Sequence, residues 1–217
     1  MFVSDWMTKK VFTVTPDDSV SSAMTLMREK EISHLPVLKG QQVAGIVSDR
    51  DIKEFSPSKA TTLDVYELHY LLEKAKIRDV MKKDVITVPA DMPVEEAAMI
   101  MHDKGIGCLP VISDNKLVGI LSDRDMYRIL VDITGVRRGG HRIYMTIEDR
   151  PGSIKEVADI IRKHGYGLLS ILTSYEGMPE GFRKVVIRAR ISGADDFEEM
   201  KKELTDLYKD VQIKRAG

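Results

Sequence analysis

Two short stretches carry the side chains that could do chemistry: GIVSDRD at residues 45–51 and GILSDRD at 119–125. Ser48 and the free N–H groups at the start of a helix would face an anion such as phosphate. Arg50 could reach the same phosphate, although an exposed arginine is more often only solvated. Asp51 can accept two hydrogen bonds at once, which matches the adjacent hydroxyls of a ribose. The second stretch repeats these residues as Ser122, Arg124 and Asp125.

A purely structural interpretation fits part of the same stretch. Ser48 and Asp51 have the spacing of a capping box, in which the serine caps a helix and the acid bonds back to the serine N–H. This interpretation leaves the preceding glycine unexplained, because glycine weakens an apolar strand. Gly45 in the first stretch and Gly119 in the second would allow a ligand or a neighbouring backbone to approach closely. Capping and ligand binding do not exclude each other.

The two stretches lie 74 positions apart because the sequence around them is repeated. Residues 3–54 align with 77–128 without a gap, and 21 of the 52 aligned pairs are identical. Each copy predicts a short extended segment, an amphipathic helix, two apolar strands joined by a polar turn, and a short helix that begins at SDRD. A unit of about 50 residues buries too little surface to be stable alone. We therefore expect the copies to pack as a pair around a pseudo-two-fold axis.

Residues 1–131 resemble a tandem of cystathionine-β-synthase (CBS) domains, or Bateman module. The resemblance rests on the two heptapeptides, on LPV at 35–37 and 109–111, and on V-x-T-V at 11–14 and 85–88. It implies two βαββα-type motifs. The implied domains are CBS motif 1 at 1–55, a linker loop and helix at 56–76, and CBS motif 2 at 77–136.

The resemblance implies clefts between the motifs that bind an adenosine ligand: AMP, ADP, ATP or S-adenosylmethionine. The nucleotide would be a regulatory ligand, and no cofactor would be required. In the family pattern, Asp51 and Asp125 hold the ribose, while Thr13 and Thr87 lie with the two serines near phosphate or sugar. One adenine would be walled by Ile32, Ser33, His34 and Pro36, and the other by Ile106, Gly107, Cys108 and Pro110. His34 and Cys108 can equally be core residues, and family members often fill only one cleft.

The C-terminal third has a different pattern. After a hinge at 137–142, residues 143–217 predict a βαββαβ order, which is the ferredoxin-like plan. The turn EDRPGSI at 148–154 resembles the signature turn of the ACT domain, a small-molecule sensing module. That resemblance implies an amino acid or small metabolite bound between paired domains. It would contact Asp149, Arg150 and Gly152, with Leu169 and Ser170 from a partner copy. The alternative is a plain strand–helix turn in a domain that only dimerises, because Asp-x-Pro-Gly is also a common turn.

The order CBS–CBS–ACT resembles the AcuB-type proteins linked to acetoin utilisation in bacteria. The expected fold is mixed α/β (α+β), with a pseudo-two-fold pair of motifs and a ferredoxin-like domain. We expect a non-catalytic, ligand-sensing regulator that forms a homodimer and acts on a partner that the sequence does not identify. No nucleophile, base and orienting group occur as a set, so we do not expect an enzyme. A structural dimerisation module with degenerate clefts and a nucleotide-handling enzyme are the alternatives.

The bulk composition excludes several other classes. The 33 Lys and Arg residues against 34 Asp and Glu give a net charge of −1, so no basic field attracts nucleic acid or anionic lipid. The single cysteine excludes an internal disulfide framework and fits a reducing cytoplasm. No run of 18 apolar residues occurs, so we expect no membrane span. The five histidines show no ligand spacing, so we expect no metal site.

Overall fold

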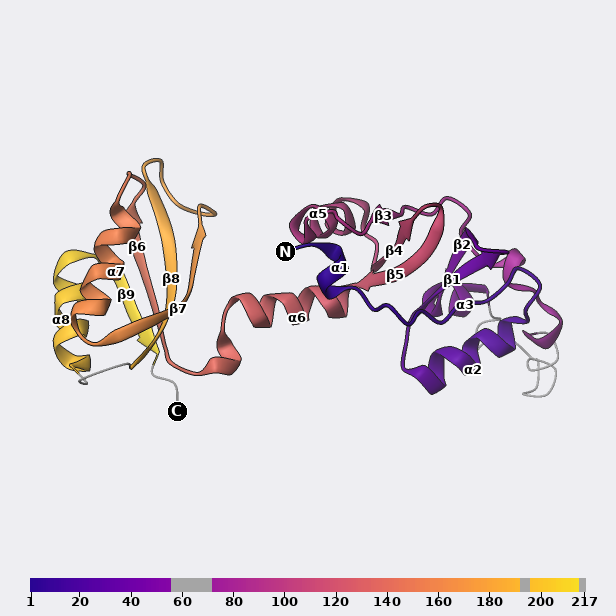
Figure 1. Cartoon of the computed structure of the whole chain (residues 1–217), viewed down its shortest axis with the longest axis horizontal. Coiled ribbons are helices and arrows are strands. Elements are labelled where there is room, and N and C mark those ends of the chain that lie inside the picture. Colours follow the sequence, from indigo (N-terminus) through magenta and orange to yellow (C-terminus); the bar gives the residue numbers. More distant parts are fainter. Residues whose placement is uncertain (56–71, 192–195, 215–217) are drawn as a thin grey trace. The chain divides into compact units, whose positions relative to one another are not determined.

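The computed structural model describes residues 1–55, 72–191 and 196–214 (Figure 1). Its contacts divide the chain into two compact units, Met1–Met126 and Tyr127–Gly217, and each unit is described by itself below. The linker loop and helix expected at 56–76 fall largely outside the described residues.

The first copy of the repeat begins with a well-capped helix. Helix α2 starts after Ser19, whose Oγ accepts a hydrogen bond from the Ser22 N–H at 3.1 Å, and it ends at Glu31 in the left-handed region. Two antiparallel strands and a short helix follow it. The elements of this copy are α1 (Val3–Trp6), α2 (Val20–Lys30), β1 (His34–Lys39), β2 (Gln42–Ser48) and α3 (Asp49–Phe55).

The second copy repeats this order. Both hairpins carry the same register irregularity, between Val37 and Leu38 in one and between Val111 and Ile112 in the other. The extended segment predicted before each main helix is short: it is a two-residue strand parallel to β4 in the second copy, and a single bridge to Val37 in the first. The elements are the 3-10 helix η1 (Ile77–Asp79), β3 (Val88–Pro89), α5 (Val94–Lys104), β4 (Cys108–Ser113), β5 (Lys116–Ser122) and α6 (Asp123–Ile133).

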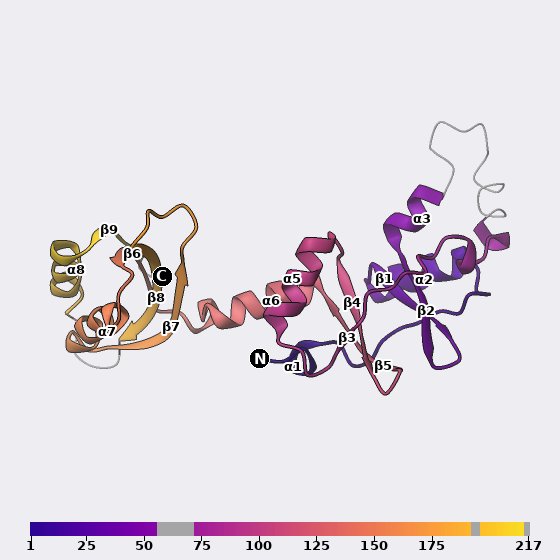
Figure 2. The same cartoon turned by 90° about the horizontal axis from the view of Figure 1, so that it is seen from above.

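The two copies exchange the first parts of their lead-in segments, by which we mean residues 1–14 and 75–88; the last residues of these segments, Val14 and Val88, pair within their own copy. Thr8 of the first lead-in bridges to Ile120 on β5, and Lys82 of the second bridges to Ile46 on β2. Helix α1 accordingly lies beside β5 (Figure 2). Each partner of one bridge lies 74 positions from its counterpart in the other. This reciprocity is what the expected pseudo-two-fold arrangement requires.

The exchange also builds the core of the first copy. Ile77, from the second lead-in, is fully buried in the cluster around α2, β1 and β2. Val3, its counterpart in the first lead-in, is likewise fully buried, and its N–H donates to the Met92 carbonyl at 2.9 Å. Each copy therefore depends on the other for part of its packing. The buried first cluster consists of Val14, Val20, Ala23, Met27, Leu35, Val37, Val47, Ile52, Leu72 and Ile77.

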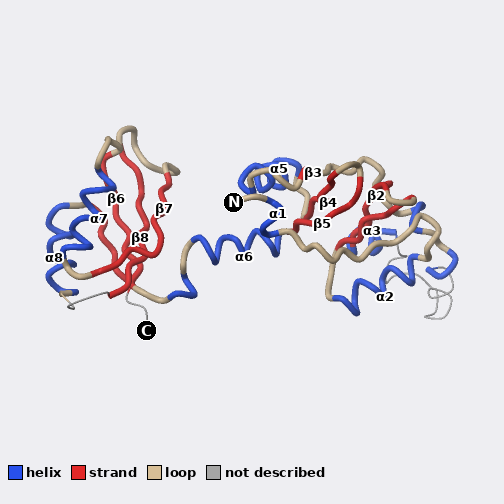
Figure 3. Tube along the Cα trace, in the orientation of Figure 1, coloured by secondary structure: helices blue, strands red, loops and turns tan. Residues whose placement is uncertain are grey.

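The C-terminal unit has the predicted order of strand, helix, strand, strand, helix, strand. Its antiparallel sheet has the order β7-β8-β6-β9, and both helices cover one face of it (Figure 3). The core joins Ile143 and Ile187 of the sheet to Ile161 and Leu204 of the helices. A 3-10 helix, η2 (Val136–Arg138), precedes it. The elements are β6 (His141–Glu148), α7 (Ser153–Lys163), β7 (Tyr166–Ser174), β8 (Phe182–Ile191), α8 (Phe197–Leu207) and β9 (Lys209–Lys214).

Within the described residues, none of the helices is both long enough and apolar enough to cross a bilayer.

Candidate functional site

The repeated heptapeptides form two helix starts with the same hydrogen bonds. In the first, the Ser48 N–H donates to the Asp51 carboxylate at 2.8 Å, and the Asp51 N–H donates to Ser48 Oγ at 3.2 Å. In the second, the Ser122 N–H donates to the Asp125 carboxylate at 2.9 Å. Both aspartates are buried, with 8% and 6% of their surface exposed. The capping box of the structural interpretation is therefore present in both copies.

Asp51 has a further partner that sequence reasoning missed. Lys82 Nζ lies 2.9 Å from Asp51 Oδ1, and Lys82 belongs to the exchanged lead-in of the second copy. Burial raises the pKa of Asp51, but hydrogen bonds from Lys82 and Ser48 outweigh burial and hold that pKa below its ordinary value. The position equivalent to Lys82 in the first lead-in is Thr8. This ion pair therefore distinguishes the two copies.

The glycine of each heptapeptide makes room for the other copy's lead-in. A Cβ built on Gly45 would lie 2.7 Å from Met81 Sδ and 3.0 Å from the Lys82 carbonyl oxygen. A Cβ on Gly119 would overlap Met7 Sδ and lie 2.9 Å from Met7 Cγ. Of the two explanations that the sequence left open, close approach of a neighbouring segment of the chain is the one that the structure provides.

A cavity of about 640 Å³, called here the larger cleft, opens at the first heptapeptide. It places that heptapeptide opposite the start of β4 in the second copy, so its walls come from both copies. The predicted site residues that line it are Ser33, His34, Ser48, Arg50, Asp51, Ile106, Gly107, Cys108 and Pro110. The residues that sequence reasoning missed are Ile46, Asp49, Lys82, Asp84, Val85, Ile86, Met101, His102, Gly105 and Asp123.

A second cavity of about 310 Å³, the smaller cleft, opens at the second heptapeptide. It is the counterpart of the larger cleft, because it joins the second heptapeptide to the start of β1 and to the first lead-in. The predicted residues that line it are Ile32, Ser33, His34, Cys108, Ser122 and Arg124. The missed residues are Thr8, Lys10, Val11, Phe12, Lys30, Glu31, Ile120 and Asp123. For the four of them in the first lead-in, the sequence signal was the similarity of MTKKVF to MKKDVI, and Ile120 and Asp123 belong to the second heptapeptide itself.

Four predicted residues line neither cleft. Asp125 is buried with its carboxylate turned to Ser122. Pro36 lies within β1 opposite Ile46. The other two are Thr13 and Thr87, each of which directly precedes a residue that pairs with a strand.

His34 and Cys108 occupy equivalent positions and line both clefts. Burial lowers the pKa of His34, against the opposing effect of Asp123, Asp49 and Asp51. Burial, with a contribution from Asp123, raises the pKa of the Cys108 thiol to about 12. The thiol therefore stays protonated near neutral pH and is a poor nucleophile.

The turn at 148–154 is held by charged side chains. Arg150 donates to Glu148 at 3.0 Å and to both oxygens of Glu156, at 2.8 and 2.7 Å. Asp149 lies 3.4 Å from Arg183 of β8, and Gly152 adopts a φ of +88° at the start of α7.

Leu169 and Ser170, expected to act from a partner copy, lie on the edge strand β7. Ser170 pairs with Arg188, and its hydroxyl donates to the Thr134 carbonyl at 2.9 Å. The turn at 148–154 lies by Arg183, further along β8. The residues of this turn and the pair Leu169 and Ser170 therefore do not meet within one chain.

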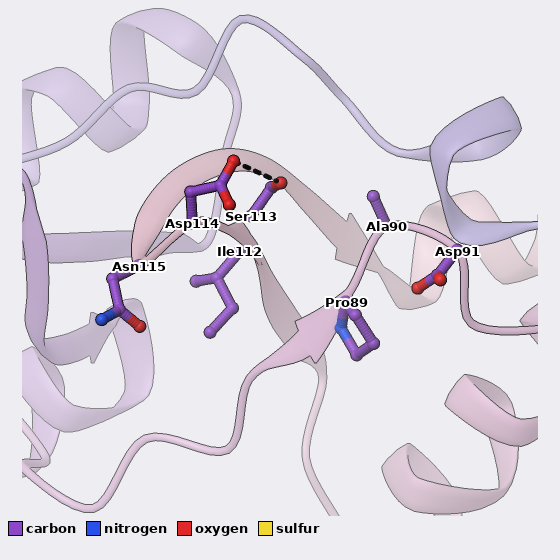
Figure 4. A pocket seen from close by; sticks show the side chains of 7 residues that line it. All are labelled: Pro89, Ala90, Asp91, Ile112, Ser113, Asp114 and Asn115. Carbon is purple, nitrogen blue, oxygen red and sulfur yellow. Dashed lines mark hydrogen bonds between the residues drawn. The ribbon is translucent and has the colours of Figure 1, made fainter.

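Two further features lie apart from the clefts. In the C-terminal unit, ligand atoms of His164, Asp196 and Glu199 lie within 4.8 Å of one another, a grouping hidden in the sequence because the histidine precedes the two acids by about thirty residues. In the first unit, an open pocket of about 660 Å³ lies at the β4–β5 turn and contains none of the predicted site residues (Figure 4). Its lining residues are Pro89, Ala90, Asp91, Ile112, Ser113, Asp114 and Asn115.

Known proteins resemble the first unit. The chain is 34% identical over 122 residues to an inosine-5'-monophosphate dehydrogenase of Methanocaldococcus jannaschii, which covers 55% of this chain and 22% of the dehydrogenase. The chain thus spans about a fifth of the length of such relatives. Among solved structures, an AcuB acetoin utilization protein from Vibrio cholerae is 29% identical with a TM-score of 0.54, covering 64% of this chain and 96% of that one.

Two other similar structures contain adenosine compounds. CBSX2, solved in complex with AMP, is 30% identical with a TM-score of 0.50 and covers 61% of this chain and 97% of its own. The CBS domain pair of protein MJ0100, in complex with 5'-methylthioadenosine and S-adenosyl-L-methionine, is 26% identical with a TM-score of 0.50 and covers 60% of this chain and 95% of its own.

The family profile of the CBS domain matches residues 3–58 and 77–132 and leaves 133–217 unassigned. These two ranges coincide with the two copies that exchange their lead-ins and enclose the clefts. The protein belongs to the CBS domain family, as a tandem pair followed by a C-terminal unit with a four-stranded antiparallel sheet.

Proposed function

We propose that this protein is a non-catalytic sensor that binds adenosine ligands in the clefts of residues 1–126. The observation that carries the proposal is that each cleft takes its heptapeptide from one copy and its opposite wall from the other. A ligand in either cleft would contact both copies and would favour arrangements in which they stay together. The AMP and S-adenosylmethionine complexes of similar CBS pairs support this class of ligand.

The sensing role extends to an unidentified partner protein. A bound nucleotide changes the activity of a partner only through a difference in its affinity for two arrangements of the sensor. Homodimers are the expected assembly, because closed two-fold pairs are the commonest oligomers. Catalysis is not part of the proposal, since Cys108 stays protonated and the cleft residues do not form a set of nucleophile, base and orienting group.

We further propose that the C-terminal unit is an ACT domain with a ferredoxin-like fold. Its strand order and its DRPG turn support this assignment. An amino acid or small metabolite would bind at Asp149, Arg150 and Gly152, together with Leu169 and Ser170 of a second chain. A thermal-shift screen of the amino acids tests this site separately from the clefts.

One observation favours a structural role for the clefts instead. The Asp51 carboxylate is already bonded to Ser48 and Lys82, so a ribose would have to share or replace these bonds. A purely structural pair would bind no adenosine compound and would show no rise in melting temperature with AMP, ATP or S-adenosylmethionine.

The decisive experiment is calorimetry with adenosine and AMP on the wild type and on the double variant Asp51→Ala, Asp125→Ala. We expect the substitutions to abolish measurable adenosine binding, because they remove Asp51, which lines the larger cleft, and Asp125, the second ribose acceptor that the CBS resemblance implies. Each substitution also removes the acidic half of a capping box, which costs about 1 kcal/mol of stability, and Asp51→Ala additionally removes the ion pair with Lys82.

A matched control separates these two effects. Ser19→Ala removes a comparable cap from α2, but Ser19 lines neither cleft. Its stability should fall by a similar amount per cap while its adenosine affinity is retained. Unchanged affinity in the double variant would reject the ribose role of the aspartates.

A further inference from the structure

The two clefts share a framework, but their charges have diverged. Position 10 is a lysine in the smaller cleft, and the equivalent position 84 is an aspartate in the larger one. Position 8 is a threonine in the smaller cleft, and its equivalent is Lys82 in the larger one. A ligand with a charged substituent therefore meets a different environment in each cleft.

The smaller cleft is basic. It contains Lys10, Lys30 and Arg124 against two acids, Glu31 and Asp123. Arg124 is held in place by donating to the Glu31 carbonyl at 3.0 Å, and Lys30 Nζ lies 5.4 Å from the centre of the Phe12 ring. Within the described part of the chain, neither lysine forms an ion pair with a carboxylate. Their charges are available to a phosphate.

The larger cleft is acidic. It contains Arg50 and Lys82 against four carboxylates, those of Asp49, Asp51, Asp84 and Asp123. The charge of Lys82 is matched by Asp51 at 2.9 Å and that of Asp49 by Lys53 at 2.8 Å, which leaves Arg50 against Asp84 and Asp123. A phosphate entering here would meet an excess of negative charge, whereas a sulfonium or ammonium group would be attracted.

We propose that the smaller cleft selects phosphorylated adenosine nucleotides and that the larger cleft selects neutral or cationic adenosine compounds, such as 5'-methylthioadenosine and S-adenosylmethionine. The inference rests on the proposed function, since it assumes that adenosine ligands bind in the clefts. It makes the protein a sensor of two ligand classes, with Lys10 and Asp84 as the residues that set the selectivity.

The test is calorimetry of the full chain with adenosine, AMP and S-adenosylmethionine at pH 8, where an ordinary histidine is uncharged. For Lys10→Asp we expect AMP to bind at least about fivefold more weakly, because a favourable charge is replaced by a repulsive one. Adenosine affinity should change less than about twofold, since adenosine carries no charge. The affinity of wild type for AMP should also fall with added salt, while that for adenosine should not.

The reciprocal variant, Asp84→Lys, reverses the charge at one position of the larger cleft. For Asp84→Lys we expect S-adenosylmethionine to bind at least about fivefold more weakly, and AMP to gain a second site. Lys9→Asp is the matched control, because Lys9 is exposed and lines neither cleft. It makes the same change in net charge as Lys10→Asp and should leave all three affinities within about twofold.

The possible failures are distinguishable. If adenosine does not bind to the wild type, the proposed function itself fails. If adenosine binds, but AMP and S-adenosylmethionine respond to neither swap, or respond equally to Lys9→Asp, the clefts bind adenosine without discriminating charge, and only this inference is overturned.

Discussion

At the scale of single residues, the aspartate of the first heptapeptide combines two roles that the sequence presented as alternatives. Ser48 and Asp51 do form a capping box, and Asp51 also lines a cleft. Sequence spacing was enough to predict the cap, because a capping box is a local pattern. It could not predict Lys82, whose contact with Asp51 depends on how a segment about thirty residues away folds back.

His34 gives the first prediction at this scale, because its pKa is lowered by burial. As pH falls below 6.5, the unfolded chain binds the proton before the folded chain does, so the free energy of unfolding should fall until the folded-state pKa is passed. We expect the melting temperature of the first unit to drop more between pH 7.5 and 5.5 in the wild type than in His34→Gln.

A histidine elsewhere controls for the substitution itself. His102 is exposed, so His102→Gln should retain the wild-type pH profile. The interpretation of His34 fails if the His34→Gln profile is as steep as that of the wild type.

At the scale of elements, glycine in β2 and β5 is required by space. Neither Gly45 nor Gly119 has a positive φ, so any residue could adopt their backbone conformation. Their hydrogen side chains let the opposite lead-in cross the strand. The repeat made both strands predictable, but the crossing was not, because it depends on which copy each lead-in joins.

We expect Gly45→Ala to lower the free energy of unfolding by about 1–3 kcal/mol through overpacking. The new methyl would meet the Lys82 carbonyl oxygen, which is backbone and cannot easily move. Gly119→Ala should cost less, because its Cβ would meet only the flexible side chain of Met7. Urea denaturation of both variants measures the difference.

Adding Met7→Ala to Gly119→Ala tests the stated cause. The double variant should be more stable than the sum of the two single effects predicts. Truncating Met7 relieves the overlap that the new methyl on residue 119 creates, and that methyl fills part of the space that Met7→Ala leaves. Strict additivity would show that Met7 does not produce the cost.

At the scale of the whole molecule, the sequence predicted the order and type of the main elements but not which elements pack together, and it did not predict the short helices α1, η1 and η2. The 74-residue repeat indicated a pair, and the C-terminal pattern indicated six elements in the order that the structure has. Periodicity reports only which face of an element is buried. Ile77 belongs to the second copy but completes the core of the first. This is a long-range contact, and a local sequence pattern does not encode it.

Because the lead-in segments cross between copies, a substitution in the lead-in segment of one copy should destabilise the other copy. We expect Ile77→Ala to cost about 2–5 kcal/mol as a cavity and to increase amide hydrogen exchange in α2 and β1, where Ile77 packs. Val3→Ala is the mirror experiment and should affect α5, which follows the segment that Val3 bonds. The amide hydrogen-exchange rates can be measured by mass spectrometry. The interpretation that the lead-in segments cross to the other copy would be contradicted if Ile77→Ala raised these rates in α5 but not in α2.

The reciprocal bridges of Thr8 and Lys82 have one more consequence. In a peptide limited to one repeat, the lead-in segment would have no strand of the other copy to pair with, and the second strand of its hairpin would have no lead-in segment crossing it. Two identical peptides would satisfy each other with the bonds that the two halves form here. The present chain is thus equivalent to a dimer of single repeats joined end to end. The pairing of its two repeats is therefore intramolecular and does not depend on protein concentration.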